Sequence, residues 1–217
     1  MKFICLGDSL AYGCWDPLGG WVNRLRDYFQ NYNLTTKTRH DRNWYWVFNL
    51  GVSGITSTYL AEKIPNGMLE GIKYPEEDTI VLVQIGKNDS YIIDKTGENY
   101  VSKKQFKKNI TAIYKAISSK TTKVVFVTPI NVDEKKLQPV PWVHEESRSV
   151  HNKEIREYNT IIKNFCAGSA AECIDLENLW GKEDYDKYLD PDGLHPNGLG
   201  HTLIFEKVRD YLLSIIK

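Results

Sequence analysis

The sequence lacks several features that would assign it to large classes of protein. Its 28 Lys and Arg residues balance 28 Asp and Glu residues, so the formal net charge is zero. A neutral chain gives no overall electrostatic reason to bind nucleic acid or an anionic membrane. There is no run of about 18 apolar residues, so we expect no membrane span. No GxxxxGK[ST] or GxGxxG pattern occurs, which argues against a phosphate or dinucleotide site.

Cysteine is also sparse, and its spacing is uninformative. The cysteines are Cys5, Cys14, Cys166 and Cys173, and no two of them are spaced as a CxxC pair. Zinc or redox chemistry is therefore not indicated, and we expect neither a metal nor an organic cofactor. No signal peptide precedes the first apolar segment, which favours a cytoplasmic location. At 217 residues, the expectation is a single domain over 1–217.

What the sequence does contain is a regular alternation of strand and helix patterns. Apolar runs predict strands at 3–6, 44–50, 79–85, 123–128 and within 171–176. Apolar residues at helical spacing predict helices at 20–31, around 60–64, and at 102–119, 149–165 and 197–216. This order predicts a three-layer α/β/α fold: a flavodoxin-like, doubly wound sheet of about five parallel strands. Right-handed crossovers then bring every strand-to-helix loop to one edge of the sheet.

Two polar groups at opposite ends of the chain carry the chemistry. Ser9 follows the first strand through Gly7 and Asp8, and His195 closes the segment Asp192-Gly193-Leu194-His195. A serine nucleophile needs a base, and the base needs an orienting carboxylate. Asp8 is adjacent to Ser9, so a structural role in the turn is favoured for it.

Four segments resemble the sequence blocks of the GDSL esterase/lipase family, in its SGNH hydrolase branch. They follow the family order and span residues 7–197, nearly the whole chain: Gly7-Asp8-Ser9-Leu10, residues 49–57 with Gly54, residues 86–89 with Asn88, and residues 192–197 with His195. One block alone is a weak signal, whereas four in order are specific. The block spacing favours Asp192 over Asp190 as the carboxylate that orients His195. Lys87 occupies the variable position of the third block, where a solvated side chain is expected.

The resemblance implies acyl transfer to Ser9, with His195 as general base and Asp192 as its orienting acid. It also implies an oxyanion hole formed by the backbone N–H groups of Ser9 and Gly54 and the side-chain amide of Asn88. The implied protein is a serine ester hydrolase for small or medium acyl esters, with O-acetyl groups on carbohydrate as one substrate class. Its partner is a small-molecule ester, and the oligomeric state stays open.

Other interpretations remain open at this point. An acyltransferase would use the same triad with an alcohol as acceptor, and a flavodoxin-like ligand-binding module would not use it at all. A set of aromatic residues in the predicted loops could line a substrate pocket: Tyr12, Trp15, Tyr91 and Trp142. The connection at 129–148 is long and rich in proline, which is typical of a lid.

Overall fold

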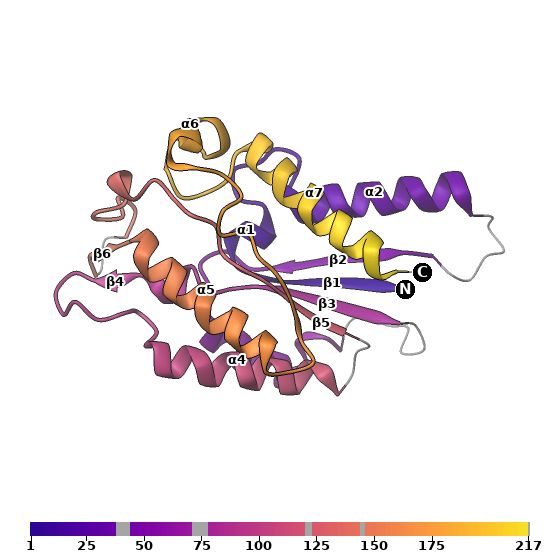
Figure 1. Cartoon of the computed structure of the whole chain (residues 1–217), viewed down its shortest axis with the longest axis horizontal. Coiled ribbons are helices and arrows are strands. Elements are labelled where there is room, and N and C mark those ends of the chain that lie inside the picture. The colour runs from indigo at the N-terminus through magenta and orange to yellow at the C-terminus, as the bar shows by residue number, and fades with distance from the viewer. Residues whose placement is uncertain (38–43, 71–77, 120–122, 144–145, 217) are drawn as a thin grey trace.

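The computed structural model of the chain describes residues 1–37, 44–70, 78–119, 123–143 and 146–216. Its centre is a parallel sheet in the spatial order β2-β1-β3-β5-β7 (Figure 1). The strands are β1 (Lys2–Gly7), β2 (Trp46–Gly51), β3 (Thr79–Gln84), β5 (Lys123–Val127) and β7 (Glu172–Ile174). Counted along the chain, the order is 2-1-3-4-5, the flavodoxin-like arrangement. The predicted fold class is thus confirmed.

Helices cover both faces of this sheet (Figure 1). On one face, α2 (Gly20–Thr36) packs with α7 (Gly198–Ile215). On the other face lie α3 (Ser57–Lys63), α4 (Lys103–Ser118) and α5 (Asn152–Ala167). Alternate residues of the central strands point into the two cores: Phe3 and Cys5 into one, and Ile4 and Leu6 into the other. This alternation is the period-2 geometry of a strand covered on both sides.

The remaining elements are short. They are α1 (Ser9–Tyr12), α6 (Tyr185–Tyr188), a π turn η1 (Ile64–Met68), and the 3-10 turns η2 (Asn88–Ser90), η3 (Glu134–Lys136) and η4 (Lys182–Asp184). Strands β4 (Ile92–Ile93) and β6 (Arg148–Ser149) form a separate antiparallel pair that the sequence did not predict, and Ser149 lies in β6 although the predicted helix 149–165 began there. Within the described ranges, every helix is too short or too polar to span a bilayer.

The strand register places the carboxyl ends of three strands at one level. Gly7 of β1 pairs with Gly51 of β2 on one side and with Gln84 of β3 on the other. The segments that leave these strands therefore start side by side, and ligand sites of open α/β sheets lie at this edge. Gly7 is required here because a Cβ on it would lie 2.3 Å from the carbonyl oxygen of Gln84.

Helix α2 is longer than the sequence pattern predicted. The expected helix ended at residue 31, but α2 continues to Thr36. Its added turn is held by Asn33, whose side chain donates to the carbonyl of Tyr45 (2.8 Å) and accepts from the Tyr45 N–H (3.0 Å). This tie to the segment before β2 compensates for the weak helix propensity of the polar residues.

Candidate active site

Ser9 stands at the point where β1 turns into α1. Asp8 is the N-cap of α1, and its carboxylate accepts a hydrogen bond from the N–H of Leu10 at 3.0 Å. Such a cap satisfies one of the free N–H groups at a helix start and fixes the turn. Asp8 thus has the structural role expected of it, and Ser9 is the first residue of the helix, only 5% exposed.

The structure brings Ser9 and His195 together, although 186 residues separate them. The Nε2 atom of His195 lies 3.0 Å from the Ser9 Oγ. On the other side of the ring, Nδ1 lies 2.6 Å from Oδ2 of Asp192. The second carboxylate oxygen of Asp192 accepts from the backbone N–H groups of Leu194 (2.8 Å) and His195 (3.0 Å). This Asp turn orients the imidazole toward Ser9.

The charge state of Asp192 suits an orienting role. Burial alone would raise the pKa of this carboxyl group, but the hydrogen bonds from His195 and from the two backbone N–H groups outweigh burial and lower the pKa to about 2. Asp192 is therefore ionised over the whole neutral range. Asp190, the alternative carboxylate, makes no described hydrogen bond to the imidazole, and burial raises its pKa.

The residues expected to bind an oxyanion lie on the two neighbouring strand-to-helix segments. Gly54 follows β2 with φ +79, and no atom lies within 4 Å of the position where its Cβ would be. Asn88 follows β3, and its Nδ2 donates one hydrogen to the carbonyl of Ile55 at 2.8 Å. An amide carries two N–H groups, so Asn88 keeps a second donor. Among the described residues, the backbone N–H groups of Ser9 and Gly54 have no protein acceptor.

Asp89 holds these two segments together. Its carboxylate accepts from the backbone N–H of Ser57, at 3.0 Å to each oxygen, and from the Ser57 hydroxyl. Burial raises the pKa of Asp89 to about 7, against the opposing effect of the hydrogen bonds from Ser57. Asp89 thereby braces the segment after β3 against the start of α3.

Two exposed indoles flank His195. Trp15 and Trp142 are 67% and 43% exposed, and their ring centroids lie 5.9 Å and 6.4 Å from the imidazole. Trp15 adopts φ 65, an uncommon backbone conformation for a bulky residue and one that is often found at functional sites. The two rings therefore form an aromatic border on the histidine side of the site.

The indole N–H of Trp15 competes with Asp192 for one nitrogen. Trp15 Nε1 lies 3.1 Å from His195 Nδ1, the atom already 2.6 Å from Asp192. A protonated Nδ1 donates to the carboxylate and cannot also accept from an indole. Because the contact with the carboxylate is shorter and charge-assisted, we assign the proton to Nδ1. The Trp15 N–H is then available to a ligand.

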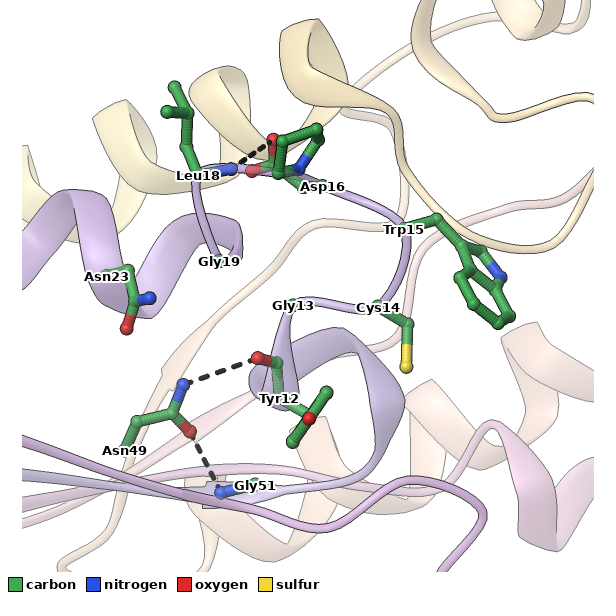
Figure 2. Close-up of a pocket in the computed structure, with 11 residues that line it drawn as sticks. Tyr12, Gly13, Cys14, Trp15, Asp16, Leu18, Gly19, Asn23, Asn49 and Gly51 are labelled. Atoms are coloured by element: carbon green, nitrogen blue, oxygen red, sulfur yellow. Dashed lines mark hydrogen bonds between the residues drawn. The ribbon is translucent and has the colours of Figure 1, made fainter.

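A depression of about 740 Å³ adjoins Trp15 (Figure 2). Residues 12–19 form one wall, and Asn23, Asn49 and Gly51 complete the lining. Figure 2 shows Trp15 at the opposite end of this lining from Asn23 and Asn49. Tyr12, which the sequence assigned to a substrate pocket, lines this depression and is 56% exposed.

The structure corrects two expectations about individual residues. Tyr91 is 5% exposed and packs in an apolar cluster with Val132 and Leu194, so it is a core residue and not a pocket surface. Lys87 is 1% exposed and not solvated. Its position in the third block gave no signal of this burial, because the direction of its side chain depends on loops distant in sequence.

The segment 129–148 borders the site, and its described part is anchored. Val132, Leu137 and Val140 are buried in the same cluster as Leu194, next to His195. These contacts make the segment a wall of the site, and its action as a lid stays a prediction. No group of three or more potential metal ligands occurs in the ranges that the structure describes.

Comparison with known proteins identifies relatives over nearly the whole chain. Residues 5–203 match the model of the GDSL-like Lipase/Acylhydrolase family. YpmR, an uncharacterized protein of Bacillus subtilis (strain 168), is 26% identical over 216 residues, covering 94% of this chain and 78% of YpmR.

Solved structures of similar fold include proteins of Enterococcus faecalis and Geobacillus stearothermophilus. A lipase/acylhydrolase from Enterococcus faecalis is 20% identical, with a TM-score of 0.71 and coverage of 100% of this chain and 98% of that one. A variant of Axe2, an acetyl xylan esterase from Geobacillus stearothermophilus, is 17% identical, with a TM-score of 0.71 and coverage of 96% and 93%. At these identities the likeness establishes the fold.

Proposed function

The chain belongs to the GDSL-like lipase/acylhydrolase family, and on that premise we propose that it is a serine ester hydrolase working through an acyl-Ser9 intermediate. The single observation that carries the proposal is the chain of contacts from Ser9 Oγ to His195 Nε2 (3.0 Å) and from His195 Nδ1 to Asp192 (2.6 Å). A hydroxyl, an imidazole and a carboxylate in this order are the elements of nucleophilic acyl transfer.

In the first half of the reaction, His195 Nε2 takes the proton of Ser9 while Oγ attacks the ester carbonyl carbon. The tetrahedral intermediate collapses, the acyl–oxygen bond of the ester breaks, and His195 returns the proton to the leaving alcohol. Asp192 stabilises the imidazolium that forms between these steps and holds the proton on Nδ1 beforehand. In the second half, water attacks the acyl carbon while His195 takes its proton. The bond between the acyl group and Ser9 Oγ then breaks, His195 returns the proton to Oγ, and the acid is released.

The developing oxyanion would be held by the N–H groups of Ser9 and Gly54 and by the side chain of Asn88. Each donor of this kind contributes about 3–4 kcal/mol to the transition state. The contact of Asn88 with the carbonyl of Ile55 supports this assignment, because it joins the Asn88 side chain to the residue after Gly54. The donors are thereby ordered before substrate binds, which is what makes such sites effective.

Small acyl esters of carbohydrate are the substrate class we favour. His195 donates its proton to the leaving alcohol, so the alcohol lies on the side of the site where Trp15 and Trp142 flank His195. Exposed indoles stack on flat faces, and the free N–H of Trp15 can donate to a hydroxyl. The fold shared with an acetyl xylan esterase is consistent with this class.

The test compares the turnover of 4-nitrophenyl acetate by the wild type, Ser9→Ala and Ser118→Ala. Ser118 is an exposed serine at the end of α4 and serves as a matched control. We expect the first variant to lose turnover while keeping its circular dichroism spectrum, and the second to keep both. Equal rates in the wild type and Ser9→Ala would refute the proposal and favour a non-catalytic binding module.

The same enzyme preparation separates the finer alternatives. A panel of 4-nitrophenyl esters of increasing acyl length, together with acetylated xylo-oligosaccharides, reports the acyl and alcohol preference. Product analysis in the presence of an added alcohol distinguishes hydrolysis of the acyl enzyme from transfer of its acyl group to the alcohol. Free acid as the main product supports hydrolysis, whereas a transferred acyl group as the main product would make the chain an acyltransferase.

A further inference from the structure

A buried lysine lies behind the site, at a position that the mechanism above does not use. Lys87 follows β3, between Gly86 and Asn88, and is among the largest side chains that are fully buried. An ammonium group is rarely buried this deeply unless it is paired, because the loss of hydration is expensive. The residues around it should therefore show what it is for.

The Nζ atom of Lys87 donates a hydrogen bond to the carbonyl oxygen of Leu194 at 3.2 Å. Leu194 directly precedes His195, and its own N–H is held by Asp192 at 2.8 Å. The peptide groups on both sides of Leu194 are thus fixed, one by the carboxylate and one by the ammonium. This carbonyl belongs to the peptide unit that connects Leu194 to the imidazole-bearing residue.

Two carboxylates compensate the charge of Lys87. Burial lowers the pKa of Lys87 to about 8, while the negative charges of Asp8 and Asp192 act in the opposite direction. Asp8 is itself 1% exposed, and burial raises its pKa, opposed by the N–H of Leu10 and by Lys87. At neutral pH the lysine is therefore charged and interacts with both the cap of α1 and the acid of the triad.

The hydrogen bond to Leu194 and the charge interaction with Asp8 link Lys87 to three parts of the site. Asp8 precedes Ser9, Lys87 precedes Asn88, and Leu194 precedes His195. Asp8, Lys87 and Leu194 are therefore each one residue away from a group with a proposed role in the reaction. A small displacement of the lysine would be transmitted to the relative positions of Ser9 and His195, on which the rate depends steeply.

We propose that Lys87 is a positioning residue of the hydrolytic site: its buried ammonium holds the Leu194 carbonyl and so fixes the 192–195 turn that aims His195 at Ser9. This inference rests on the proposed roles of Ser9 and His195. A merely structural lysine would contribute to the stability of the fold and leave the geometry of these two residues unchanged.

The central variant is Lys87→Met, which keeps most of the side-chain volume and removes the ammonium. Lys104→Met, at an exposed position near the start of α4, is the matched control. With 4-nitrophenyl acetate we expect kcat of Lys87→Met to fall by about 10- to 100-fold while KM stays unchanged. The control should match the wild type in both constants.

A second measurement reads the geometry of His195 directly. The proton between His195 Nδ1 and Asp192 gives a low-field proton NMR signal that is well separated from the rest of the spectrum. In Lys87→Met we expect this signal to shift or to broaden by exchange with water, because the turn that carries Asp192 and His195 has lost its hydrogen bond to Lys87. In Lys104→Met it should stay in place.

Loss of the lysine also leaves Asp8 as a buried carboxylate without its compensating cation, and this can destabilise the fold. The double variant Asp8→Asn/Lys87→Met removes both charges and is compared with Asp8→Asn alone. We expect the double variant to be more stable than Lys87→Met but to have a lower kcat than Asp8→Asn. Equal kcat in these two folded proteins, with an unshifted NMR signal, would overturn the positioning role.

The outcomes also separate this inference from the proposed function. If Ser9→Ala retains full turnover, the hydrolase mechanism fails, and the role of Lys87 falls with it. If Ser9→Ala is inactive while Lys87→Met has the kcat and NMR signal of the wild type, the mechanism stands and only the role of Lys87 is refuted.

Discussion

Replacing Asp192 by Asn tests whether His195 needs a carboxylate to orient its imidazole, or only a polar side chain of the same size. The amide oxygen of Asn can still accept from the N–H groups of Leu194 and His195, as Oδ1 of Asp192 does now. Its NH₂ group would then face Nδ1 of the imidazole and donate to it. The ring proton must move to Nε2, where it points at the Ser9 hydroxyl and prevents His195 from acting as a base.

The size of the effect follows from this change of tautomer. A wrongly protonated imidazole with the rest of the site intact lowers kcat by about 10,000-fold, or about 5.5 kcal/mol of activation free energy. The N–H of Trp15, 3.1 Å from Nδ1, would add a second donor to the unprotonated nitrogen and stabilise the inactive tautomer. Recovery at high pH is not expected, because the defect is not one of ionisation.

The assay is kcat for 4-nitrophenyl acetate between about pH 5 and 9, where the wild-type carboxyl group, with a pKa of about 2, is ionised. Asp190→Asn is the matched control, since Asp190 makes no described hydrogen bond to the imidazole ring. We expect kcat of the control to stay within about tenfold of the wild type. If Asp190→Asn lost activity as strongly as Asp192→Asn, or if Asp192→Asn kept more than about a tenth of the wild-type kcat, the assignment of Asp192 would be wrong.

Three further predictions concern the same edge of the sheet. Asn88→Ala should lower kcat by about 100- to 1,000-fold with little change in KM, as measured by steady-state kinetics, because it removes a donor to the oxyanion. Gly54→Ala should lower kcat and also cost about 1 kcal/mol of stability in urea unfolding, because alanine is strained at φ +79 even though no atom crowds its Cβ. The ionised state of Asp192 should contribute about 2 kcal/mol of stability, fully present above about pH 4 and lost as the pH falls through about 2. Urea titrations at several pH values should therefore show a shallower acid dependence for Asp192→Asn than for the wild type, and parallel curves would contradict the shifted pKa.

The strands and the doubly wound fold class could be predicted from the sequence because apolar runs and their alternation with helices are local patterns. The continuous apolar run at 79–85 predicted a strand, and β3 lies there, central in the sheet and buried on both faces. The end of α2 could not be predicted, since it depends on Asn33 and Tyr45, which meet only in the folded chain. The same is true of the pair β4 and β6, whose two-residue strands are too short to leave a periodic signal.

For the site, the sequence indicated residue types at strand ends but not the directions of side chains. Ser9 and His195 were identified as a pair, and the structure places them 3.0 Å apart. Lys87 was expected to be solvated and Tyr91 to line a substrate pocket, but both side chains are buried. The contact of Trp15 with His195 spans 180 positions and has no counterpart in any local motif.

The central claim is that Ser9 is an activated nucleophile, and covalent labelling tests it most directly. The protein is treated with a fluorophosphonate, digested, and the adduct is located by peptide mass spectrometry. We expect one adduct per chain, on Ser9, and a much slower reaction in His195→Ala. Stoichiometric labelling at another residue, or an equal rate in the wild type and His195→Ala, would contradict it.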